Sequence, residues 1–228
     1  MQGTIVNVGA IIVGCTAGLL FRDRLPEKYR TVIMQGICLG VILIGLQMAM
    51  SVEESVQVII VIFSLVIGGI VGEFLSLEKR LNNFGEYIKS RFSGEDEHFV
   101  EGFVQASLIY CVGAMAIMGA IEDGLSGDAS LLYTKSLLDG TSAIAFTATF
   151  GAGVMFSAIP VFIYQGTISL LAAEVSGYLG KVVIAEMTST GGLLIFAIGL
   201  NMLKITEIKI GNLLPSIFVA ICGALLFL

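Results

Sequence analysis

Charged side chains are scarce in this sequence, where they make up 13% of the 228 residues. Soluble globular domains usually carry about 25%, so the chain has too few polar residues to cover a water-soluble fold, and 56% of it is hydrophobic. There is no tryptophan, and the four cysteines lie far apart within apolar runs. That spacing gives no sign of a disulfide framework or of a cysteine metal site.

Motifs of common catalytic sites are missing too. The sequence has no Walker loop, no dinucleotide fingerprint, no GxSxG elbow, no HExxH and no CxxC. With His98 as the single histidine, metal or acyl-transfer chemistry has little to work with, so we expect no enzyme, no cofactor and no metal. The net charge of −6 argues against a nucleic-acid partner.

The chain does contain a series of apolar runs, most of them near the roughly 20 residues that cross the hydrocarbon core of a bilayer. They fall at 3–21, 32–50, 56–75, 99–121, 137–158, 160–180, 188–203 and 211–228. The sequence therefore predicts an all-α integral membrane protein with about eight transmembrane helices, organised as one polytopic domain over 1–228. Its expected surrounding is the lipid bilayer.

The basic residues predict how these helices are oriented. Ten of the 12 Lys and Arg residues fall in connections that would face one side of the membrane. They are Arg22, Arg24, Lys28, Arg30, Lys79, Arg80, Lys89, Arg91, Lys204 and Lys209. Lys135 and Lys181 fall in connections on the other side, among acidic residues such as Glu53, Asp123 and Glu186. Because the side rich in Lys and Arg is normally cytoplasmic, both termini should be extracytoplasmic.

The one long polar connection, 76–98, repeats apolar residues at spacings of three or four. These residues are Leu77, Leu81, Phe84, Ile88 and Phe92. The spacing is that of an amphipathic helix, which we expect to lie along the inner membrane surface before the polar stretch 94–98 ends it. The segment is either a plain cytoplasmic connector or a lipid-binding regulatory element.

A weak internal repeat pairs helices one to three (3–75) with helices six to eight (160–228), on either side of the central helices (99–158). Gly3-Thr4-Ile5 recurs as Gly166-Thr167-Ile168, and a second set of residues recurs at a fixed offset of 154. That set is Leu39, Ile44, Gly45, Leu46, Met48, Glu53 and Gly69. Five crossings separate helix one from helix six, so the repeat is inverted, as in many alternating-access transporters. Chance resemblance of Gly-rich and Leu-rich helices is the alternative.

Polar residues gather in the fifth and sixth predicted helices, together with glycines that let a helix unwind or pack closely. The candidate solute ligands are Thr141, Ser142, Thr147, Thr149, Tyr164, Gln165 and Thr167, with Asn7 of the first helix. Transporters hold solutes with such groups, but tight packing of small residues is an equal alternative. Asp139 and Glu174 are candidates for coupling to a proton or cation, unless Glu174 reaches the membrane interface.

Pairs of glycines four residues apart predict close helix contacts, inside one protomer or between two. They are Gly14/Gly18, Gly36/Gly40 and Gly68/Gly72. Inverted-repeat proteins of this size often pair, so we expect a homodimer.

Several short segments also carry a resemblance to a known family. They are Gly3-Thr4-Ile5-Val6-Asn7 leading to Gly14, Leu25-Pro26-Glu27, Met34-Gln35-Gly36, Asp139-Gly140, Ser157-Ala158-Ile159-Pro160-Val161 and Tyr164-Gln165-Gly166. With them the whole chain resembles the YdfK/YqgA-like bacterial membrane proteins, known as domain of unknown function 554. The resemblance implies a multi-pass protein of the prokaryotic cytoplasmic (inner) membrane and assigns no functional residues.

Together these features predict a small secondary transporter that moves an unknown small solute or ion by alternating access through an inverted-repeat site. A passive ion or solute channel and a non-transporting membrane scaffold or regulator that uses 76–98 are the alternatives.

Overall fold

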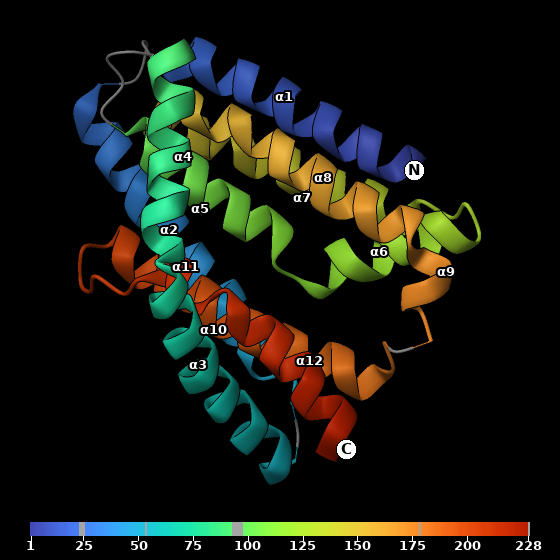
Figure 1. Cartoon of the computed structure of the whole chain (residues 1–228). Helices are drawn as coiled ribbons and strands as arrows, with labels where there is room; N and C mark the ends of the chain where they lie inside the picture. Colours follow the sequence, from blue (N-terminus) through green and yellow to red (C-terminus); the bar gives the residue numbers. More distant parts are fainter. Residues whose placement is uncertain (23–25, 53, 93–97, 178, 228) are drawn as a thin grey trace. The chain divides into compact units, whose positions relative to one another are not determined.

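The computed structural model describes residues 1–22, 26–52, 54–92, 98–177 and 179–227, and every regular element in them is helical (Figure 1). The elements are α1 (Gln2–Arg22), α2 (Glu27–Ala49), α3 (Ser55–Leu75), α4 (Leu77–Phe92), α5 (Phe99–Cys111), α6 (Ala114–Leu125), α7 (Ser130–Phe150), the 3₁₀ helix η1 (Gly151–Ser157), α8 (Ala158–Leu170), α9 (Ala172–Val175), α10 (Lys181–Met202), α11 (Ile210–Leu213) and α12 (Pro215–Phe227). Arg24, Glu53 and 94–97, which entered the sequence predictions, lie outside the described residues.

Six described segments are long and apolar enough to cross a membrane. They are Gln2–Arg22, Thr31–Ala49, Ser55–Leu75, Ser130–Leu170, Lys181–Met202 and Ile210–Phe227. The bent pair Phe99–Cys111 and Met115–Leu125 adds a seventh if the two helices are counted as one broken span. These helices expose large apolar side chains, such as Phe74 at 87% and Leu226 at 76%, which lipid accommodates and water does not. The prediction of an all-α membrane protein is confirmed.

The predicted total of about eight crossings differs from this result around the fourth, fifth and sixth helices. The fourth predicted helix, 99–121, is two helices, α5 and α6, which meet at an angle of 59° beside Gly113. The fifth, 137–158, and the first half of the sixth, 160–180, fall within the apolar segment Ser130–Leu170, which is 41 residues long, and α9 follows this segment.

The chain reverses its direction within that segment. Asn7 donates hydrogen bonds to both Asp139 and Gln165, which are 165 − 139 = 26 positions apart. A straight helix would separate them by about 39 Å. The turn lies at η1, whose first residue, Gly151, has a φ of +80° that glycine adopts without strain. Helices α7 and α8 are therefore separate helices, as the sequence predicted.

The helices form two compact units. Unit 1 consists of residues 1–37, 82–111 and 115–175, and unit 2 of residues 38–81, 112–114 and 176–228. Unit 1 thus holds α1, α5, α7, η1, α8 and α9 with most of α6, and unit 2 holds α3, α10, α11 and α12. Helices α2 and α4 contribute residues to both units.

Unit 1 is built on close packing of α1 against α7 (Figure 1). A Cβ atom on Gly14 would overlap the carbonyl of Gly140, and one on Gly18 would lie 2.6 Å from Ile144 O. Contact positions rise together along the two helices, so α1 and α7 run parallel. The close contact predicted for Gly14 and Gly18 is confirmed.

The predicted amphipathic helix is also present, as α4. Ile88 is buried in a cluster with Phe99 and Phe103 of α5, and the Phe84 ring lies 5.9 Å from that of Phe103. Part of its apolar face therefore packs on protein rather than on lipid.

In unit 2, α2 packs against α10 through glycines on both helices. A Cβ atom on Gly45 would overlap the backbone of Phe196 and lie 2.9 Å from Gly192 O. One on Gly199 would lie 3.1 Å from Ile42 N and 3.3 Å from Cys38 O. Contact positions rise on one helix as they fall on the other, so these helices run antiparallel.

Helix α3 packs against α11 and α12 in the same antiparallel sense. Gly68 faces Ser216 and Gly72 faces Asn212, as the spacing of the two glycines predicted. Near the end of α3, Glu73 accepts hydrogen bonds from Lys209 at 3.0 and 3.1 Å and from Asn212 at 2.6 Å. Gly36 and Gly40 have no described atom within 4 Å of an added Cβ.

The glycine contacts of α2 lead to a first prediction. Gly45→Ala and Gly199→Ala should each destabilise the protein by about 1–3 kcal/mol, the usual cost of overpacking. Gly40→Ala, on the same helix but facing open space, should be neutral or stabilising by up to about 1 kcal/mol because alanine favours helix. Denaturant unfolding in detergent micelles measures all three, and equal effects at Gly40 and Gly45 would contradict the packing.

Candidate functional site

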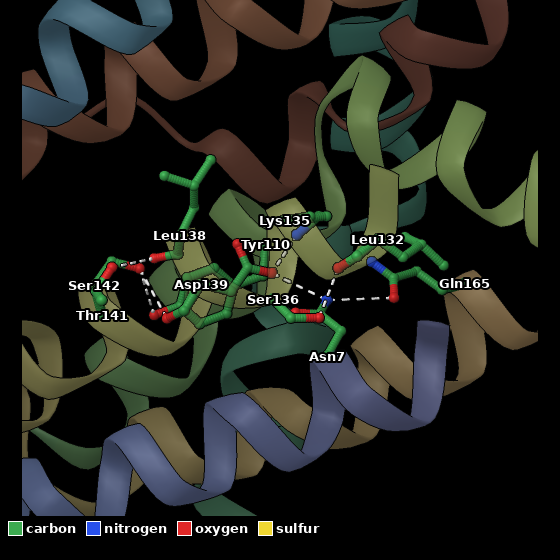
Figure 2. A network of polar contacts seen from close by, with 10 residues as sticks. All are labelled: Asn7, Tyr110, Leu132, Lys135, Ser136, Leu138, Asp139, Thr141, Ser142 and Gln165. Atoms are coloured by element: carbon green, nitrogen blue, oxygen red, sulfur yellow. Dashed lines mark hydrogen bonds and ion pairs between the residues drawn. The ribbon is translucent and has the colours of Figure 1, made fainter. Parts of the chain in front are cut away.

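Three helices of unit 1 contribute buried polar side chains that meet in one network, shown in Figure 2: Asn7 from α1, Lys135 and Asp139 from α7, and Gln165 from α8. Asn7 Nδ2 donates to Asp139 Oδ2 at 3.1 Å and to Gln165 Oε1 at 3.3 Å. Lys135 Nζ forms an ion pair with the same Asp139 oxygen. We call these four residues the polar cluster.

Backbone packing explains why these side chains meet. The close glycine contacts between α1 and α7 bring Asn7 beside Asp139, and the reversal at η1 returns α8 past the same place. Asn7 and Gln165 are fully buried, and so is most of the surface of Lys135 and Asp139, at 6% and 8% exposure.

Lys135 corrects a prediction. The sequence placed it in an outward-facing connection before a helix that begins at 137, whereas α7 begins at Ser130. Ser130 donates to the Asp128 carboxylate from its backbone N–H at 3.0 Å and its hydroxyl at 2.6 Å. These bonds fix the start of α7 and lower the pKa of the exposed Asp128 carboxyl. Lys135 and Asp139 then lie one helical turn apart on one face.

Two more acidic residues predicted in connections lie within helices. Asp123 is buried near the end of α6, where its carboxylate accepts the Gly3 N–H at 3.1 Å and so caps the beginning of α1. Glu186 lies on α10 in unit 2, fully buried, and neither carboxylate oxygen has a hydrogen-bond partner among the described residues. Burying an ionised carboxylate in this way costs several kcal/mol.

Tyr110 and Ser142 lie at the edge of the polar cluster. Ser142 Oγ is 3.3 Å from Tyr110 Oη and 3.0 Å from the carbonyl oxygen of Asp139. The Lys135 ammonium group lies 5.9 Å from the centre of the Tyr110 ring, within the range of a cation–π contact.

The polar cluster leaves one acceptor and one donor unused. Asn7 Oδ1 and Gln165 Nε2 are buried without a hydrogen-bond partner in the part of the chain that the structure describes. An ionised Asp139 carboxylate can only accept hydrogen bonds, so the Asn7 side chain must turn its amide nitrogen toward it. Because that nitrogen also donates to Gln165, the amide of Gln165 must turn its oxygen toward Asn7. Buried polar groups are normally paired, so this acceptor and donor are suited to a bound polar molecule.

The other predicted site residues differ in their surroundings. Thr147 is fully buried and Tyr164 is half-buried. Thr141 and Thr149 bond to carbonyl oxygens of their own helix at 2.8 and 3.0 Å. Thr167 and Glu174 are exposed. The structure thus brings together Asn7, Asp139 and Gln165, while Ser142 bonds to the backbone carbonyl of Asp139 and lies beside Tyr110. No described contact joins Glu174 to them.

Beside the polar cluster, residues of α1 and α7 line an open groove of about 360 Å³. Small and apolar residues line it, among them Ala10, Gly14, Ser136 and Gly140. Asp139 does not line this groove. Among the described residues, no group of three His, Cys, Asp or Glu side chains could hold a metal ion.

Comparisons with known proteins agree with the resemblance seen in the sequence. The family model described as "Protein of unknown function (DUF554)" matches residues 2–225. A Bacillus subtilis (strain 168) protein, "Uncharacterized membrane protein YdfK", is 34% identical over 220 residues, which cover 96% of this chain and 93% of the relative. An Escherichia coli (strain K12) protein, "Uncharacterized protein YqgA", is 29% identical over 223 residues, covering 96% and 94%. No solved structure matches the chain.

The ion pair leads to a second prediction. Lys135→Met should destabilise the protein by about 3–5 kcal/mol, because it leaves the buried Asp139 charge without its partner. The double variant Lys135→Met/Asp139→Leu should regain most of this loss, since two apolar side chains replace the pair. Lys181→Met, at an exposed lysine, is the matched control. Denaturant unfolding in micelles measures the three variants, and a double variant no more stable than the single one would rule out the pair as an energetic unit.

Proposed function

Because the chain belongs to the DUF554 family and is a helical membrane protein, we propose that it is a small secondary transporter of the prokaryotic cytoplasmic membrane. It moves a small polar solute by alternating access, and the polar cluster of unit 1 binds that solute. The proposed site keeps Asn7, Ser142, Asp139 and Gln165 from the sequence prediction and adds Lys135.

The observation that carries this proposal is the unused acceptor and donor in the polar cluster. Ionisable residues within membrane-crossing helices are costly and usually serve a substrate or ion pathway. Here the lysine and the aspartate neutralise each other, while Asn7 Oδ1 and Gln165 Nε2 have no partner among the described residues. A solute that carries both a donor and an acceptor, such as a small zwitterion, would satisfy both amides.

Packing in unit 2 supports the inverted repeat. The backbone contacts of Gly45 are with Phe196 N and Gly192 O, and those of Gly199 are with Ile42 N and Cys38 O. Adding the offset of 154 to 45, 42 and 38 gives 199, 196 and 192. The two sets of contacts are therefore reciprocal, as a two-fold axis between α2 and α10 requires.

The directions of the helices bear on how that axis would lie in the membrane. The repeat pairs α2 with α10 and α3 with α12. In each pair the two helices are antiparallel. A two-fold axis that exchanges antiparallel helices is perpendicular to them, so for helices that cross the bilayer it lies in the membrane plane. This is the symmetry of inverted-repeat transporters, whose halves exchange conformations to open a site to either side.

The same directions fit the orientation inferred from the basic residues. Helices α1 and α7 should both run inward if the termini are outside, and they are parallel. Helices α2 and α10 should run in opposite directions, and they are antiparallel. We retain extracytoplasmic termini and a homodimer as parts of the proposal, and cross-linking in native membranes checks the dimer.

Transport is tested with the full-length protein in liposomes, by recording solute-driven currents and uptake over a panel of zwitterionic, neutral and cationic solutes. Asn7→Ala and Gln165→Ala should each weaken apparent solute binding by about 5- to 150-fold, as expected for losing about 1–3 kcal/mol of buried hydrogen bonding. Uptake should also saturate with solute concentration.

Thr134→Ala is the matched control, because Thr134 is exposed on α7 and its hydroxyl bonds to its own helix. It should transport like the wild type. Conductance that does not saturate would favour the passive channel. Absence of flux, together with loss of lipid or partner recruitment when α4 is deleted, would favour the scaffold.

Orientation is tested with single cysteines in a background without native cysteine. Ser126→Cys, in the exposed turn before α7, should react in intact cells with a maleimide that cannot cross the membrane. Ile205→Cys, in the exposed turn after α10, should react only after the membrane is opened. The reverse pattern would place the termini in the cytoplasm.

A further inference from the structure

A second polar site lies in unit 2, on α10. Glu186 is fully buried, and both of its carboxylate oxygens lack hydrogen-bond partners within the described part of the chain. Thr190 is one helical turn further along, on the same face. It is also fully buried, and no described residue forms a hydrogen bond with its hydroxyl oxygen. Two adjacent turns of α10 therefore present three buried polar oxygens that no described side chain satisfies.

The elements packed against α10 do not supply a described counter-charge. The turn after α2 bonds to α10 through Ser51 Oγ and Ala185 O at 3.0 Å. Beyond it, Glu54 is exposed and caps α3 together with Gln57. At the far end of α3, Glu73 is paired with Lys209. Glu53 and Tyr178 lie outside the described residues.

The remaining charged and titratable groups on these elements are few. Lys181, at the start of α10, is exposed. The part of α2 in unit 2 carries Cys38, and α12 carries Cys222. The stretch 112–114, which contacts α10 at Gly191, has none. No described cation neutralises Glu186, and Glu186 belongs to no group of three His, Cys, Asp or Glu side chains that could hold a metal ion among the described residues.

We propose that Glu186, with Thr190 beside it, binds and releases the proton that drives transport. The carboxylate takes a proton from water on one side of the membrane and is buried as the neutral acid. It returns the proton to water on the other side when the conformation changes. This inference rests on the proposed function for its role in transport, but the proton site itself does not depend on the solute.

The coupling follows from linkage. A conformation that buries Glu186 without partners binds the proton more tightly than one in which water reaches the carboxylate, because water stabilises the charged form. Proton binding must then favour the buried conformation by the same factor. Asp139 is less suited to this task, because Lys135 and Asn7 stabilise its charge in place.

The proton site is tested with dicyclohexylcarbodiimide, an apolar reagent to which protonated carboxyl groups add in apolar surroundings. The full-length protein is treated in liposomes of phosphatidylethanolamine and phosphatidylglycerol over a range of pH, and modified peptides are identified by mass spectrometry. We expect Glu186 to be modified at neutral pH and the rate to fall as the pH rises. No modification at any pH, or a rate independent of pH, would overturn the proposal. Reading the modified peptide from the wild type keeps the test valid even if a variant misfolds.

Two variants separate this inference from the proposed function. Glu186→Gln should lower uptake driven by a pH gradient by about tenfold or more, within the usual range of coupling, and Asp139→Asn should leave the modification of Glu186 unchanged. If Glu186 of the wild type is modified but no solute flux is measured, the proton site is supported and the proposed transport function is contradicted. If solute flux changes neither with a pH gradient nor with Glu186→Gln, the transport function is supported and the proton role of Glu186 is contradicted.

Discussion

Lys135 and Asp139 are buried as a pair within a helix of membrane-spanning length, and the interior of unit 1 depends on this pairing. Either charge alone would be far more costly to bury, since lipid offers no water to solvate it. The pair requires α7 to be helical from Ser130, so that the two side chains share one face. Asn7 adds a hydrogen bond to the carboxylate, and Asn7 reaches it because glycines bring α1 close to α7.

Close backbone approach also organises unit 2. There the glycines of α2 and α10 contact each other's helices at positions related by one sequence offset. A side chain at Gly45 or Gly199 would push apart two helices that the proposed mechanism needs in near-equivalent environments. The sequence similarity between the two halves is weak because few positions make such contacts. The positions that face lipid can hold many different apolar residues. Glycines at the contact are the part of the repeat that packing constrains.

Much of the fold could be predicted from hydropathy and glycine spacing. The helices around 3–21, 32–50 and 56–75 agree with the structure to within a few residues, apart from a longer beginning of α2. The bend between α5 and α6 was not predicted, because no proline or charge lies between 102 and 121. Gly113, with a φ of +153°, was the available signal.

Only part of the candidate site could be predicted, because polar side chains in the first turns of a buried helix shorten the apolar run by which that helix is recognised. Lys135 and Glu186 were assigned to connections since apolar runs were taken as the limits of the helices. The spacing of four between Lys135 and Asp139 was a visible sign of an ion pair on one helix face. No sequence signal distinguishes Gln165, which the reversal at η1 brings to Asn7, from Thr167, which is exposed.

The central claim, that one site in unit 1 opens alternately to each side of the membrane, is tested most directly by the reactivity of a single cysteine at Ser142. In a background without native cysteine, impermeant thiol reagents are applied to right-side-out and to inverted vesicles. Alternating access requires this cysteine to react from either side of the membrane, and solute should slow both reactions. A cysteine that reacts from neither side, with or without solute, would contradict it.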